Sequence, residues 1–112
     1  MKFSGGDFRS RLPLPATKKW PEGVWYTDAF GHGTMVLLLF APQGADHQTA
    51  HDQDEIYVVV SGNAEVTTAD GTESVAQGDA IFIPAGEEHH FEGMSEDFAA
   101  WVVFWGPSGG ED

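Results

Sequence analysis

The feature that most constrains this fold is a succession of short β-type segments separated by turn residues. Runs rich in Val, Ile, Phe, Tyr and Trp alternate with Gly, Pro, Asn and Asp, and helical periodicity is almost absent. Short strands at such spacing indicate a closed barrel or a jelly-roll sandwich, so we predict an all-β fold. Asp70-Gly71 further predicts a hairpin turn between two of the strands. The expected strands are 24–30, 34–41, 55–60, 64–68, 72–75, 80–83, 89–92 and 98–105.

The cationic residues are confined to one end of the chain. All five Lys and Arg lie within the first 19 residues, whereas seventeen of the eighteen acidic residues lie in 20–112. We therefore divide the chain into a basic extended arm, 1–19, and a β-barrel, 20–112. A surface this acidic repels nucleic acid and anionic membranes, so neither is expected as a partner. The charge has two interpretations: a solubility device, and an arm that docks on an acidic barrel, its own or a partner's.

The composition and the N-terminal sequence narrow the chemistry and the location. Cysteine is absent, which excludes disulfides, iron–sulfur clusters, thiolate zinc sites and cysteine nucleophiles. The N-terminal residues contain no apolar run of signal-peptide length, and the longest apolar stretch, 35–41, is too short to cross a bilayer. We expect a soluble cytoplasmic protein.

Two imidazoles and a carboxylate mark the candidate site. His51 and Glu55 are four residues apart where a loop enters a predicted strand, and His89 follows a tight turn at Pro84 and Gly86. Imidazole and carboxylate ligands with open positions suit iron, manganese, nickel, copper or zinc. A calcium or magnesium site would require more oxygen ligands. The sequence therefore predicts a divalent transition metal.

These segments resemble the two motifs of the cupin superfamily. Glu55 is followed by six residues and a glycine, as at the end of the first motif. The second motif is matched by a series of four residues at the expected spacings: Gly78, Pro84, Gly86 and His89. The resemblance implies a small single-domain cupin, folded as a double-stranded β-helix (jelly-roll barrel), with a metal held by His51, Glu55 and His89.

The chain departs from the family pattern at three positions. Thr49 replaces the first motif histidine, Gln43 the opening glycine and Gly93 the closing asparagine. The usual set of three His and one Glu is thus reduced to three ligands. Three substitutes for the missing ligand remain open: Gln48, which needs a bulge to face inward, His47, which needs a bend in the strand, and a water molecule.

Several functions remain open at this point. A metal with free positions would support a metal-dependent oxygenase, such as a dioxygenase, or a Lewis-acid cyclase or isomerase, with Glu55 as a catalytic base. Because the barrel contains no Lys or Arg, a small neutral or aromatic substrate is expected rather than an anion. The alternatives are a non-catalytic cupin that binds a small-molecule ligand and a metal-free structural barrel.

The resemblance also implies an assembly. Small cupins commonly pair, so we expect a homodimer in which residues 1–19 lie across the neighbouring barrel. A set of aromatic residues is expected in the core or in that interface rather than in the wall of a substrate site: Trp20, Trp25, Tyr26, Trp101, Phe104 and Trp105.

Overall fold

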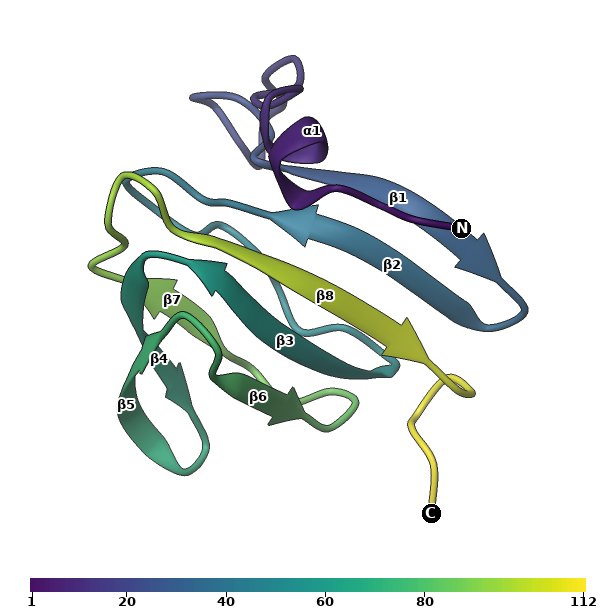
Figure 1. The fold of residues 1–112 in the computed structure, drawn as a ribbon. Helices are drawn as coiled ribbons and strands as arrows, with labels where there is room; N and C mark the ends of the chain where they lie inside the picture. Colours follow the sequence, from purple (N-terminus) through teal and green to yellow (C-terminus); the bar gives the residue numbers. More distant parts are fainter.

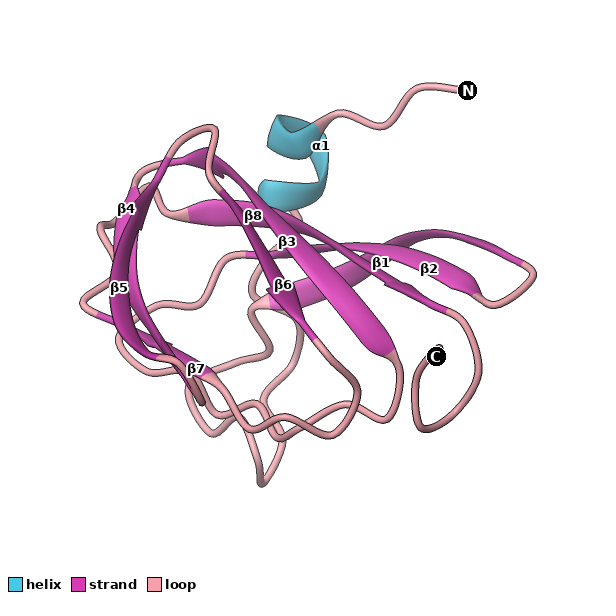
Figure 2. Ribbon diagram, turned by 90° about the horizontal axis from the view of Figure 1, so that it is seen from below, coloured by secondary structure: helices cyan, strands magenta, loops and turns pink.

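The computed structural model describes residues 1–112 and consists of two antiparallel β-sheets that face each other (Figures 1 and 2). The larger sheet has five strands in the order β1-β2-β8-β3-β6, and the smaller has the order β5-β4-β7. The strands are β1 Tyr26–His32, β2 Met35–Phe40, β3 Asp54–Ser61, β4 Asn63–Thr68, β5 Gly71–Ala76, β6 Ala80–Ile83, β7 His90–Glu92 and β8 Ala99–Trp105. The predicted all-β jelly-roll fold is confirmed.

The core lies between the sheets and is formed by alternate residues of the strands. Along β3, Tyr57 and Val59 are buried, whereas Val58 between them is 38% exposed. This alternation follows from the two-residue period of a strand, which directs successive side chains to opposite faces. Val66 of β4 and Phe91 of β7 approach from the smaller sheet and complete the same core. Strand β3 therefore aims every second side chain into the barrel.

Turn glycines connect the strands as the sequence predicts. β4 and β5 form a hairpin whose register pairs Thr68 with Gly71, as expected from Asp70-Gly71. Gly62, between β3 and β4, has a positive φ of 71°, and a Cβ there would lie 2.7 Å from the Phe98 Cα. Only glycine fits that position without strain, because both the backbone conformation and the space exclude a side chain.

The N-terminal arm folds onto the barrel of its own chain. Residues 1–19, which we expected to be extended, contain the short helix α1, Gly5–Arg9, beside the larger sheet (Figure 2). Phe8 of α1 is buried in a small cluster with Leu39 of β2, and the Arg9 guanidinium lies 5.3 Å from the centre of a Trp25 ring. No Lys or Arg forms an ion pair with a carboxylate. Apolar burial, cation–π contact and hydrogen bonds therefore hold the arm, among them the paired backbone bonds between Leu14 and Val24. No helix in the structure has the length and apolar character needed to span a membrane.

Candidate functional site

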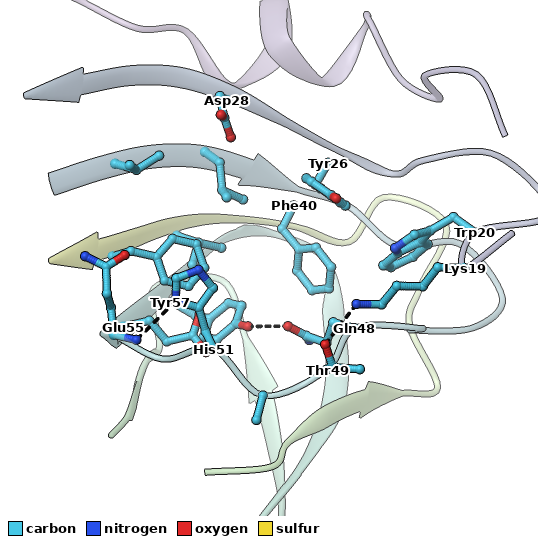
Figure 3. A pocket seen from close by; sticks show the side chains of 16 residues that line it. Lys19, Trp20, Tyr26, Asp28, Phe40, Gln48, Thr49, His51, Glu55 and Tyr57 are labelled. Carbon is cyan, nitrogen blue, oxygen red and sulfur yellow. Dashed lines mark hydrogen bonds between the residues drawn. The ribbon is translucent and has the colours of Figure 1, made fainter. Parts of the chain in front are cut away.

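A cavity of about 370 Å³ lies against the inner face of the larger sheet (Figure 3). Its apolar wall includes Trp20, Tyr26, Leu38, Phe40, Val102 and Phe104. Trp20 belongs to the hydrophobic core and Phe104 packs against it, as expected, and both also line this cavity together with Tyr26. The strands β1, β2 and β8 each turn alternate side chains toward this cavity, which explains why residues of these strands line it.

A buried acid–base pair lies at this site. Glu55, which β3 directs inward, places Oε1 2.8 Å from the Nε2 of His89, and the two side chains are 2% and 0% exposed. His89 follows the turn after β6, where its Nδ1 lies 2.9 Å from the carbonyl oxygen of Glu87. Because a carbonyl oxygen only accepts, Nδ1 carries a proton, and Nε2 is the nitrogen that faces the carboxylate.

Tyr57 extends this pair into a chain of polar contacts. Its hydroxyl donates to Gln48 Oε1 at 2.8 Å and also lies 2.8 Å from His89 Nε2. Asp46 holds the loop in place, because its carboxylate accepts from the backbone N–H groups of Gln48 and Phe91. Four side chains from a loop, a strand and a turn are thus joined in the order Gln48, Tyr57, His89, Glu55.

The environment shifts two pKa values. Burial alone would lower the pKa of His89, but its hydrogen bonds to the Glu55 carboxylate and the Glu87 carbonyl outweigh burial and raise it. Burial, together with the nearby charge of Glu55, raises the pKa of Tyr57 well above its ordinary value of 10.0. Tyr57 therefore remains a protonated donor, and the contact with Glu55 favours the protonated form of His89 against the effect of burial.

His51 occupies the wall of the cavity rather than the buried pair. Its ring stacks on Phe104 with 3.8 Å between the ring centres, and its Nδ1 accepts a hydrogen bond from the backbone N–H of Gln53. The side chain is 40% exposed. Glu55 lines the same cavity, so the two residues share one space without direct contact between their polar atoms.

The two proposed substitutes for the missing histidine lie in different places. Gln48 lines the cavity and reaches Tyr57, whereas His47 contacts the Glu22 carboxylate at 3.3 Å and packs edge-on against Trp20. His47 does not line the cavity. Thr49, at the position of the motif histidine, accepts a hydrogen bond from Lys19 Nζ at 2.9 Å.

A metal ion requires several donor atoms that converge on one point. No three His, Asp or Glu side chains gather into a group that could hold a metal. Two features nevertheless fit one. The Glu55 Oε2 is buried with no hydrogen-bond partner, and the Glu87 carbonyl fixes His89 in the tautomer that directs Nε2 to a ligand. Glu55 and His89 are thus the two residues that would hold a divalent transition metal, with His51 on the adjacent wall.

Sequence reasoning missed one residue of the cavity. Lys19, from the basic arm, is the only cation that lines it. No Lys or Arg was placed at the site from the sequence, whereas the structure brings Lys19 there because the arm folds over its own barrel. The only sequence feature that pointed to this position was the charge of the arm. One of the two interpretations of that charge was an arm that docks on an acidic barrel, its own or a partner's.

Comparison with known proteins identifies the fold family and leaves the activity open. The family model described as a cupin domain matches residues 36–105. SCO3923, an uncharacterized protein of Streptomyces coelicolor, is 47% identical over 62 residues, which cover 55% of this chain and 59% of that protein.

Solved structures agree on the fold. The DMSP lyase DddQ from Ruegeria pomeroyi has a TM-score of 0.63 at 23% identity, covering 72% of this chain and 46% of that chain. KdgF from Halomonas sp. has the same TM-score at 19% identity, covering 71% of this chain and 76% of that chain. The chain thus spans less than two thirds of both SCO3923 and DddQ. At these identities the structural likeness shows a shared barrel.

Proposed function

Because the chain belongs to the cupin domain family, we propose that it binds a small aromatic or otherwise apolar molecule in the barrel, beside a divalent transition metal held by Glu55 and His89. One observation supports this most directly. A buried carboxylate oxygen, Glu55 Oε2, has no partner although the other oxygen of the same group contacts an imidazole. An unpaired buried oxygen costs free energy, and a bound cation would remove that cost.

The side chains around the pair have separate roles in this proposal. Tyr57 donates to Gln48 and touches His89, so it holds both in place. Phe40 and Phe104 offer ring faces to an aromatic ligand and exclude water from the site. If Glu55 leaves the metal, its Oε2 is the atom that would accept a proton from a substrate. When bound, the metal would supply Lewis-acid chemistry, or oxygen chemistry if it is a redox metal.

A catalytic role is proposed on analogy of fold. The neighbour DddQ is described as a lyase, so the same barrel does support catalysis in another protein. A second function, binding without metal or turnover, is favoured by a different observation. Glu55 and His89 already lie 2.8 Å apart and neutralise each other.

Elemental analysis of protein purified without chelators or an affinity tag tests the metal. We expect stoichiometric iron, manganese, nickel, copper or zinc in the wild type and in His47→Ala, the matched histidine that does not line the cavity. Glu55→Gln and His89→Ala should lose the metal, and His51→Ala should hold it more weakly. Circular dichroism would confirm that each variant is folded.

Two results would contradict the metal proposal. One is a wild type that holds no metal even after reconstitution, which would leave the metal-free binding function. The other is a metal retained equally by Glu55→Gln and His89→Ala, which would place the ion elsewhere in the chain.

A further inference from the structure

We infer that the ligand of this cavity carries a carboxylate beside its aromatic or apolar body, and that Lys19 binds that carboxylate. The inference rests on the proposed function, because it names the ligand class of the same cavity.

Lys19 lies at the end of the cavity away from Glu55 and His51. Figure 3 shows its side chain reaching Thr49 on one side of the cavity, whereas Glu55 and His51 lie on the other. An ammonium group has three donors, and Thr49 accepts from one of them. The other donors are free to meet a ligand that extends from the aromatic wall toward this end.

A short turn holds Lys19 over the cavity. Thr17 and Trp20 bond reciprocally: the Thr17 N–H donates to the Trp20 carbonyl, and the Trp20 N–H donates to the Thr17 hydroxyl, both at 3.0 Å. Trp20 is 3% exposed and anchors this turn in the core. Lys18 belongs to the same turn and does not line the cavity. The turn therefore places Lys19 at the cavity and leaves the adjacent Lys18 outside it.

The charge of Lys19 is not used by the protein itself. The chain has eighteen acidic residues, yet the Lys19 ammonium pairs with none of them and bonds to a neutral hydroxyl. Thr49 stands where the family motif has a histidine, and its small side chain receives the ammonium. Charge-assisted hydrogen bonds to a carboxylate are about twice as strong as neutral ones. In a chain with a net charge of −13, one cation at the cavity gives an anionic group a local site.

The volume limits the body of the ligand. At about 370 Å³ the cavity lies near the lower end of the range for small-molecule sites, roughly 300–1,000 Å³. One aromatic ring with a short acidic side chain fits such a space. Cinnamate is a suitable probe, and cinnamamide has nearly the same shape without the charge.

The test compares these two probes on three proteins of known metal content. Wild type, Lys19→Gln and the matched control Lys18→Gln are titrated by calorimetry and by the fluorescence of tryptophan, since Trp20 lines the cavity. We expect the wild type and Lys18→Gln to bind cinnamate about tenfold more tightly than cinnamamide. Lys19→Gln should lose most of this preference while its affinity for cinnamamide stays unchanged.

The outcomes separate the inference from the proposed function. Equal affinity for acid and amide in the wild type, or a preference that persists in Lys19→Gln, would overturn the inference and leave cavity binding intact. Failure of the wild type to bind either probe would overturn both. Equal losses in Lys18→Gln and Lys19→Gln would show a general charge effect and would also overturn the role given to Lys19.

Discussion

Replacing Tyr57 by Phe removes one oxygen atom from the centre of the polar chain. The residue is 1% exposed, and its ring packs against Phe40 and Phe91, contacts that phenylalanine retains. The lost hydroxyl lies 2.8 Å from both Gln48 Oε1 and His89 Nε2. The substitution thus separates the hydrogen bonding of Tyr57 from its packing.

The expected cost follows from these two contacts. A buried hydrogen bond contributes on the order of 1 kcal/mol, so two contacts predict a loss of about 2 kcal/mol in the free energy of unfolding. For a domain of this size each kcal/mol shifts Tm by roughly 4 °C, which predicts a decrease of about 8 °C. Urea unfolding should show a lower midpoint with an unchanged slope, because the surface exposed on unfolding is the same. Tyr26→Phe, at a residue 37% exposed, is the control and should change Tm little.

Two results would refute this reasoning. A loss below about 0.5 kcal/mol would mean that the Tyr57 hydroxyl does not join the two side chains in solution, since even one hydrogen bond contributes about that much. A loss above about 4 kcal/mol would exceed what the hydroxyl can supply and would indicate a repacked core. A changed slope in urea would point to the same conclusion.

Two further predictions concern the turns and the assembly. Gly62→Ala should cost about 3 kcal/mol in chemical unfolding, since a positive φ is combined with a clash against Phe98, whereas Gly93→Ala, with a positive φ and open space, should cost about 1 kcal/mol. Equal costs would contradict this account. Light scattering of the wild type should give twice the 12.1 kDa mass of one chain. A wild-type monomer at micromolar concentration would refute the proposed homodimer.

Most of the fold could be predicted from the sequence because its signals are local. Each of the eight strands was expected within one or two residues of its bounds at both ends, since alternation and turn residues act over a few positions. Helix α1 was not predicted, because its five residues are too few to show helical periodicity. Phe8, which anchors the helix, makes contacts with residues distant in the sequence.

The site could be predicted only in part, because its contacts join distant segments. Motif spacing located Glu55 and His89, which the structure places 2.8 Å apart. The bond between Gln48 and Tyr57 depends on how a loop closes over a strand, and the approach of Lys19 depends on how the arm docks. Neither contact has a short-range signal in the sequence, because each joins segments that are distant along the chain.

Strand pairing also explains why His51 differs from the other two proposed ligands. Glu55 lies opposite Phe104 in the register of β3 and β8, so the ring on which His51 stacks is placed by the same pairing that directs Glu55 inward. His51 has a packing partner that stabilises its position without a metal, whereas Glu55 Oε2 has no partner at all. In the proposed metal site, a cation would therefore act mainly on the buried pair. This asymmetry supports a site in which Glu55 and His89 determine metal affinity and His51 adjusts it.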